Sequence, residues 1–117
     1  MNNKDTGFLG ETMATSHLLE LGFEILERNW RYKHLEIDII ASKENLLHIV
    51  EVKTRSSVQF GYPEQMIQAQ KMQFLKNAAA HYQFSNPQWI WLQFDVIAIY
   101  LKPTNQWALD YFEDVYF

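Results

Sequence analysis

The 117-residue chain contains no cysteine, which excludes disulfide bonds and thiolate metal ligands. It has only four glycines and three prolines, and no stretch rich in either that would serve as an interdomain linker. No apolar run approaches the roughly 20 residues that a membrane-spanning helix needs, and no signal-peptide pattern opens the chain. We therefore expect one domain over residues 1–117, in a reducing compartment, the cytoplasm.

Positive charge is also scarce. Ten Lys or Arg stand against 14 Asp or Glu, and the resulting net charge of −4 argues mildly against non-specific binding to nucleic acid. The distribution of charge along the chain is less unfavourable to nucleic-acid binding. Residues 28–76 hold eight Lys or Arg and five acids, whereas residues 103–117 hold three acids and no Lys or Arg. This division is compatible with a phosphate-binding face, and equally with a random scatter of surface charge.

What the chain has in quantity is apolar side chains, at 48% hydrophobic and 15% aromatic, as expected of a folded globule. Apolar periodicity and turn-forming residues predict the order helix, three strands, helix, two strands. The predicted helices cover residues 6–21 and 63–82, and the predicted strands cover 23–32, 35–41, 48–55, 89–101 and 106–112. The fold class is therefore α/β, a single domain with a mixed central sheet flanked by helices.

The strand at residues 48–55 carries two charges within an apolar run. Side chains alternate across a strand, so Glu51 and Lys53 point to the same face, roughly 6–7 Å apart along the strand. Burying a lone charge is costly. The pair therefore needs charged partners, a metal ion or a solvated cleft.

A second acid is predicted to lie near this pair. Residues 35–41 also form a strand, and Asn45 is a turn former in the short connection that follows, so the two strands should form an antiparallel hairpin. The hairpin brings Asp38 close to Glu51 and Lys53. Two carboxylates can hold a hard divalent cation, and an ammonium group can contact the attacking water or a phosphate. A partly buried ion-pair cluster without chemistry is the alternative.

An ordered set of short motifs resembles a known group of nucleases. The motifs are Gly10-Glu11, Asn29 with Arg31, Glu36-Ile37-Asp38, residues 51–55 (EVKTR), Phe60-Gly61-Tyr62-Pro63, Lys71 and Phe94-Asp95-Val96. Over roughly residues 7–100 the chain resembles the YraN family of small bacterial proteins, which is similar to archaeal Holliday-junction resolvases and to the PD-(D/E)xK nuclease superfamily. The resemblance implies a restriction-endonuclease-like core.

The resemblance also implies a metal site. Asp38 and Glu51 would hold Mg²⁺ or Mn²⁺, helped by Glu11 and by the backbone carbonyl of Val52. Lys53 would orient the attacking water or stabilise the charge on the phosphate. For Glu11 the alternative is an ordinary first-turn glutamate that the helix dipole favours.

Other residues would support the site or bind nucleic acid. The resemblance makes Glu36 a supporting acid, and Asp95 either supports the site or anchors a loop. The candidates for phosphate contacts are Arg31, Lys33, Arg55 and Lys71. Lys71 either extends past the core or reaches into the cleft. Trp30 and Tyr32 either stack on bases or, as is more common, pack against the sheet.

The resulting hypothesis is a metal-dependent endonuclease acting on DNA, including structured or branched DNA. The first alternative is a nucleic-acid-binding module of nuclease fold with little or no catalysis. It draws on two departures from the family pattern, Leu35 in place of a glycine and Gln93 in place of an arginine. The second alternative is a protein-interaction domain that uses the aromatic C-terminal surface. Junction resolvases of this type are symmetric dimers, which suggests a homodimer here.

Overall fold

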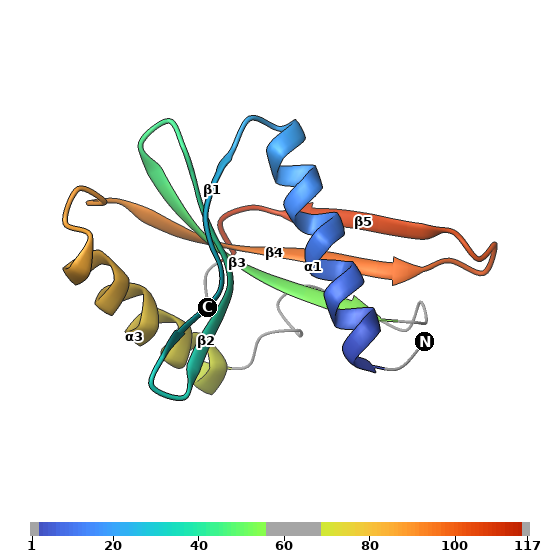
Figure 1. Ribbon diagram of the computed structural model, residues 1–117, viewed down its shortest axis with the longest axis horizontal. Helices are drawn as coiled ribbons and strands as arrows, with labels where there is room; N and C mark the ends of the chain where they lie inside the picture. The colour runs from blue at the N-terminus through green and yellow to red at the C-terminus, as the bar shows by residue number, and fades with distance from the viewer. Residues whose placement is uncertain (1–2, 56–68, 116–117) are drawn as a thin grey trace.

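The structure is a computed structural model that describes residues 3–55 and 69–115 (Figure 1). Its elements are α1 (Asn3–Glu20), β1 (Glu24–Tyr32), β2 (Leu35–Lys43), β3 (Leu46–Arg55), α3 (Ala69–Ser85), β4 (Leu92–Leu101) and β5 (Trp107–Phe112). The predicted α/β class and the predicted order of helices and strands are confirmed. The predicted turn at residues 60–63 and the start of the second predicted helix lie outside the described residues.

The five strands form one mixed sheet in the order β1-β2-β3-β4-β5. Neighbouring strands are antiparallel except β3 and β4, which run parallel, and α3 lies between these two in the chain. The tight turn from β2 to β3 places Glu44 and Asn45 at φ angles of 53° and 67°. Two consecutive positive φ angles are what a two-residue hairpin of this kind requires, and asparagine tolerates them well.

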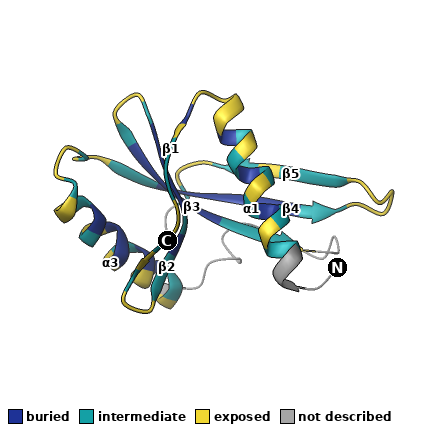
Figure 2. Cartoon of the chain, viewed as in Figure 1, coloured by how far each residue is buried: buried dark blue, intermediate teal, exposed yellow. Residues whose placement is uncertain are grey.

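The two helices cover opposite faces of the sheet, and each face has its own apolar cluster (Figure 1). On one face, Ala14 and Leu18 of α1 pack with Phe23, Ile39, Ala41, Val50, Ile97 and Ile99. On the other, α3 contributes Met72, Leu75, Ala78, Ala79 and Tyr82, which pack with Ile37, Ile40, Leu47, Ile49, Phe94 and Val96. Strands β3 and β4 are covered on both faces and are the most continuously buried strands (Figure 2).

The regular alternation of β2 fails at one position, Asp38. Pairing with β3 runs as far as Ile39 opposite Val50 and then stops. Ile37 packs on the face covered by α3, whereas Ile39 packs on the face covered by α1, although two residues apart on a regular strand should share a face. The strands β2 and β3 therefore part here, and the acids of the candidate site lie around this point. Among the described residues, no helix combines the length and the apolar character needed to cross a membrane.

Candidate metal-binding site

Three carboxylates from two elements meet beside the point where β2 and β3 part. One oxygen of Glu11, on α1, and one each of Glu36 and Asp38, on β2, all lie within 4.8 Å of one another. The amide of Asn29, on β1, donates a hydrogen bond to Glu11 Oε2 at 3.0 Å. Asn29 has a φ angle of 52°, which asparagine adopts more readily than most residues. We call Glu11, Glu36 and Asp38 the acidic trio.

Close packing of α1 brings Glu11 to the sheet. Gly10 is buried, and a Cβ atom at this position would lie 1.9 Å from Thr54 Oγ1, near the end of β3. Any larger residue would push the helix and the strand apart or force the threonine to move. The glycine in the Gly10-Glu11 motif therefore allows the approach that places the carboxylate beside the end of β3.

Asp38 has the most perturbed environment of the trio. Burial raises its pKa, as do the nearby charges of Glu51 and Glu11, while the Val52 N–H and Lys71 oppose the shift, and the result is a pKa of about 7. The Val52 N–H donates to Asp38 Oδ2 at 2.8 Å. Because burial disfavours the ionised form of Asp38 and the charges of Glu51 and Glu11 repel it, a bound cation would stabilise the ionised carboxylate.

Glu51 lies on β3 with one oxygen paired and the other not. Its Oε1 is 3.5 Å from the Nζ of Lys53 and 3.6 Å from the Nζ of Lys71, which reaches it from α3. The residue is only 5% exposed, and its Oε2 is buried without a hydrogen-bond partner among residues 3–55 and 69–115. A buried carboxylate oxygen without a partner is costly, so Oε2 is a vacant acceptor.

The structure therefore places the predicted ligands in two adjoining groups. Glu51, with its two lysines, is not a member of the acidic trio, but it is close enough to Asp38 for its charge to raise that pKa. Glu36, predicted as a supporting acid, belongs to the trio, and Arg31 Nη2 pairs with its Oε2 at 3.0 Å. The prediction that Asp38 and Glu51 share one cation stays a prediction.

The chemistry of this donor set fits a hard cation. All the side-chain donors are carboxylates, and Mg²⁺ and Mn²⁺ prefer oxygen ligands. Neither cysteine nor histidine is present among the members of the two groups, which argues against a zinc site of the usual kind. A divalent cation would give the unpaired Oε2 of Glu51 a partner, and it would lower the raised pKa of Asp38 by stabilising the ionised carboxylate.

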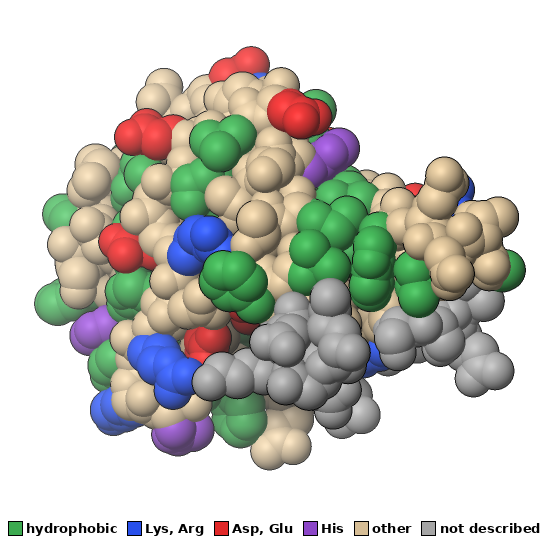
Figure 3. Space-filling view, turned by 45° about the vertical axis from the view of Figure 1, so that its right-hand side comes forward, with side chains coloured by type: hydrophobic (Ala, Val, Ile, Leu, Met, Phe, Trp, Pro, Cys, Tyr) green, Lys and Arg blue, Asp and Glu red, His purple; other side chains and the backbone are tan. Residues whose placement is uncertain are grey.

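The predicted phosphate-binding cations occupy different settings. Arg31 and Lys71 are paired with acids of the two groups; Arg31 is exposed and Lys71 is partly exposed, with 71% and 44% of their side-chain surface accessible. Lys33 lies over the Tyr32 ring, with its Nζ 5.4 Å from the ring centre, and the Arg55 guanidinium donates to the Thr54 carbonyl at 2.9 Å. Figure 3 shows Lys, Arg and His side chains around an acidic side chain at the lower left of this face.

Asp95, the other predicted supporting residue, is held in a separate network. Its Oδ2 lies 2.6 Å from His48 Nδ1 and accepts a 2.6 Å hydrogen bond from the Tyr111 hydroxyl. Its Oδ1 accepts hydrogen bonds from the Gln93 amide and from the Asp114 backbone N–H, at 2.8 and 2.9 Å. These partners all lie outside the two acidic groups, and the bond to Asp114 ties down the chain after β5.

This network is built for structure and not for a metal. One ligand atom of each of His48, Asp95 and Glu113 lies within 4.8 Å of the others, but both oxygens of Asp95 already accept two hydrogen bonds. Burial opposes ionisation of Asp95, yet the hydrogen bonds outweigh it and hold its pKa below the usual value. His48 lies three residues before Glu51 on β3, so side-chain alternation puts the two on opposite faces, and this is the sequence signal that could have revealed the second cluster.

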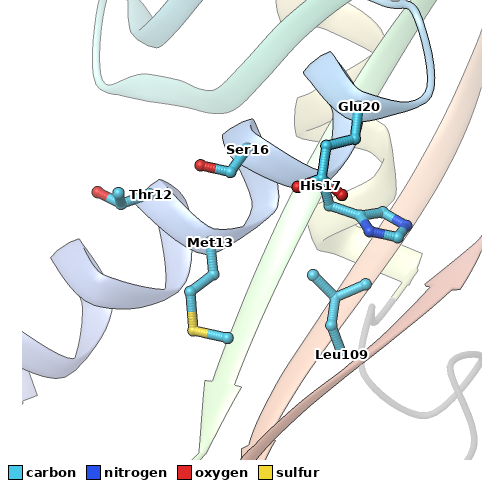
Figure 4. A pocket seen from close by; sticks show the side chains of 6 residues that line it. All are labelled: Thr12, Met13, Ser16, His17, Glu20 and Leu109. Carbon is cyan, nitrogen blue, oxygen red and sulfur yellow. The ribbon is translucent and has the colours of Figure 1, made fainter.

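A shallow groove lies elsewhere, between α1 and β5 (Figure 4). It encloses about 270 Å³ and is lined by Thr12, Met13, Ser16, His17, Glu20 and Leu109. His17 packs edge-on against Tyr111, with ring centres 6.2 Å apart, so this histidine serves packing. The groove shares no lining residue with either acidic group.

Comparison with known proteins places the chain in a family. A family model described as uncharacterised protein family UPF0102 matches residues 10–99. The chain belongs to the UPF0102 family. This is the YraN family that the motifs resemble, so that prediction is confirmed. The matched region includes the acidic trio, Glu51, Lys53 and Lys71.

Several members of the family are similar along most of their length. A UPF0102 protein of Flavobacterium psychrophilum is 43% identical over 115 residues, which cover 98% of this chain and 96% of that protein. A UPF0102 protein of Clostridioides difficile is 43% identical over 106 residues, which cover 86% of this chain and 90% of that protein. One from Caldicellulosiruptor saccharolyticus is 40% identical over 107 residues, covering 91% of each chain.

Proposed function

We propose that the chain is a metal-dependent phosphodiesterase that cuts DNA. The observation that carries the proposal is the buried Oε2 of Glu51, which has no hydrogen-bond partner within residues 3–55 and 69–115, near Asp38, whose pKa is raised to about 7. A buried carboxylate oxygen without a hydrogen-bond partner is costly to keep, and strongly perturbed acids gather at functional sites. The resemblance to PD-(D/E)xK nucleases gives the same residues a catalytic role.

The proposed metal is Mg²⁺ or Mn²⁺, held by Asp38, Glu51, Glu11 and the Val52 carbonyl. When bound, the ion would supply a Lewis acid that polarises the phosphate and lowers the pKa of a bound water. The charges of both Glu51 and Glu11 act on the Asp38 carboxylate, and Asn29 holds Glu11 in place through its 3.0 Å hydrogen bond. Glu36 supports this arrangement and is itself held by Arg31.

Lys53 is the proposed catalytic ammonium. It shares a face of β3 with Glu51, which holds its Nζ at 3.5 Å, and about a fifth of its side chain is exposed. From this position it would orient the attacking water or stabilise the negative charge that develops on the phosphate. Such electrostatic contributions are worth about 3–4 kcal/mol in related cases. Lys71 adds a second ammonium at the same carboxylate.

The proposed substrate is DNA, including structured or branched DNA, in the cytoplasm. Arg31, Lys33, Arg55 and Lys71 would contact its phosphates, and exposed cations of this kind bind without sequence preference. A homodimer, as in the resolvases that the family resembles, would match the symmetry of a four-way junction. Sedimentation of the purified protein with and without junction DNA tests this part.

A DNA-binding module without catalysis is the second candidate. Gln93 stands in place of the family's arginine, and its neutral amide donates to Asp95 where a cation could have served an acid or a phosphate. Leu35, in place of a glycine, packs against the apolar cluster under α3. Neither departure removes an acid or lysine of the proposed site, so catalysis is the first choice.

One assay separates the two candidates. Purified protein is incubated with single-stranded, duplex and four-way DNA in Mn²⁺, beside the Lys53→Ala variant. We expect the wild type to cleave one of these substrates and the variant to lose at least about 100-fold in rate, with binding retained. Binding without cleavage by the wild type would favour the second candidate, and cleavage at the full rate by the variant would refute the role of Lys53.

A further inference from the structure

The end of the β1–β2 hairpin forms a stack of aromatic rings against α3. Tyr32, the last residue of β1, lies parallel to the ring of His81, with ring centres 3.7 Å apart and planes 9° apart. Lys33 lies over the same tyrosine, with its Nζ 5.4 Å from the ring centre. Because the imidazole already occupies one face at 3.7 Å, the ammonium must lie over the other face.

The inner part of the stack has a structural role. The Trp30 ring meets the ring of Tyr82 edge-on at 5.2 Å and lies 6.3 Å from the ring of His81. Tyr82 is a buried member of the cluster under α3, and Trp30 packs against that cluster. These contacts fix the β1–β2 hairpin to α3 and so hold the ring of Tyr32 in place.

The outer face of Tyr32 is covered differently. Its neighbour there is Lys33, which is exposed and extends from the turn. Stacking of a nucleic-acid base on an aromatic side chain is generally stronger than the contact of an exposed cation with a ring. A base would therefore displace the ammonium. The displaced Lys33 would then be available to a phosphate of the same strand.

The surroundings of this ring suit a nucleic-acid strand. Exposed Arg31 and Lys33 flank Tyr32 in the chain, and exposed His34 follows. Arg31, the residue before Tyr32, pairs with Glu36 of the acidic trio at 3.0 Å, which links this hairpin to the candidate metal site. A base on Tyr32 would thus lie on the same hairpin as the acids of β2.

We propose that the outer face of Tyr32 binds an unpaired DNA base, on the hairpin that also carries Glu36 and Asp38 of the candidate metal site. The inference rests on the proposed function and narrows its substrate to DNA with an unpaired base near the cleaved bond, such as a single strand, a flap or an open branch point. In a continuous duplex every base is stacked on its neighbours, and Tyr32 would have none to receive.

Binding is tested without divalent cations, so that no cleavage is needed. The fluorescence anisotropy of three labelled ligands is measured: a thymidine strand of about 20 nucleotides, an abasic strand of equal charge, and a duplex of the same length. We expect the wild type to bind the thymidine strand about tenfold more tightly than the abasic strand. The abasic ligand removes the bases without altering the protein, so this comparison does not depend on the folding of any variant.

A pair of variants tests the residue itself. Tyr32→Leu should remove the preference for the thymidine strand, while Tyr32→Phe, which keeps the ring, should preserve it. Three results would overturn the inference: no binding of either single strand, equal binding of both by the wild type, or an unchanged preference in Tyr32→Leu. If the wild type prefers the thymidine strand but cleaves no DNA in the Mn²⁺ assay, the phosphodiesterase proposal fails. The base-binding site on Tyr32 is then still supported.

Discussion

The backbone N–H of Val52 donates a 2.8 Å hydrogen bond to Asp38 Oδ2, just beyond the point where pairing between β2 and β3 ends. The Asp38 carboxylate thus accepts the hydrogen bond of a backbone N–H that no longer has a partner in the β2–β3 pairing. The bond ties Asp38 to the segment of β3 that carries Glu51 and Lys53. The two halves of the candidate site are joined by this contact.

The stability of the metal-free protein should fall as the pH rises from about 4 to about 7. The pKa of Asp38 is raised from 3.8 to about 7, so over this range the folded state holds a proton that the unfolded state has lost. Asp38→Asn cannot ionise and should be more stable than the wild type at pH 8, by about 2–4 kcal/mol. Urea unfolding of both proteins at pH 5 and pH 8, in a chelator, measures this. Equal pH dependence in the two proteins would contradict the raised pKa of Asp38.

Metal affinity should have the opposite pH dependence. Because a cation competes with the proton on Asp38, the affinity for Mn²⁺ should rise with pH up to about 7 and level off above it. Proton release on binding can be measured by titration calorimetry in buffers of different ionisation enthalpy. A pH-independent affinity between pH 5 and pH 7 would show that Asp38 does not bind the ion.

Asn29 should matter for metal affinity and not for stability. Asn29→Gly keeps the positive φ angle of 52° at no steric cost but removes the amide that holds Glu11. Loss of a partner that orients a metal ligand typically weakens binding by about 10-fold or more. The matched control is Asn45→Gly, since Asn45 also has a positive φ angle, 67°, but lies in the β2–β3 turn. Equal Mn²⁺ affinity in both variants would argue against the orienting role.

Replacement of Asp95 should have the opposite outcome to replacement of Asn29, with a large effect on stability and none on metal affinity. It is 1% exposed and accepts bonds from His48, Tyr111, Gln93 and Asp114. Asp95→Asn should cost about 3–5 kcal/mol at pH 7, measured by urea unfolding, because a buried charge-assisted network loses its acceptor.

The pH dependence of this loss follows from the lowered pKa of Asp95. Its contribution is complete above the unfolded pKa of 3.8 and disappears as the pH falls towards the lower folded value, so the two proteins should converge in acid. The exposed Glu113 is the control position, and Glu113→Gln should stay within about 0.5 kcal/mol of the wild type. A loss of Mn²⁺ binding in folded Asp95→Asn would mean that this network does support the metal site.

The sequence predicted the fold well because its signals are local. The hairpin at Asn45 and the apolar runs of β3 and β4 follow from turn chemistry and from burial on both faces. The ends of elements were less accurate: α3 ends at Ser85, three residues beyond the prediction, and β4 begins at Leu92 and not at residue 89. Helix ends depend on packing that local patterns do not encode.

The candidate site was only partly predictable. Alternation along β3 placed Glu51 with Lys53, and this pairing is found in the structure, where Glu36 and Asp38 of β2 also meet. The division into an acidic trio and a separate glutamate with two lysines depends on where β2 and β3 part. That parting and the Asp38–Val52 bond beside it are tertiary features. The close approach of α1 to β3 at Gly10 is likewise a tertiary feature that local sequence patterns do not reveal.

Mn²⁺ binding to the purified protein, measured by titration calorimetry at pH 8, tests the central claim most directly. We expect saturable binding by the wild type, a loss of about 100-fold or more in Asp38→Asn and in Glu51→Gln, and no change in Glu113→Gln, which alters an exposed acid of the other network. Equal affinity in all four proteins, or no binding by the wild type, would contradict a cation site built on Asp38 and Glu51.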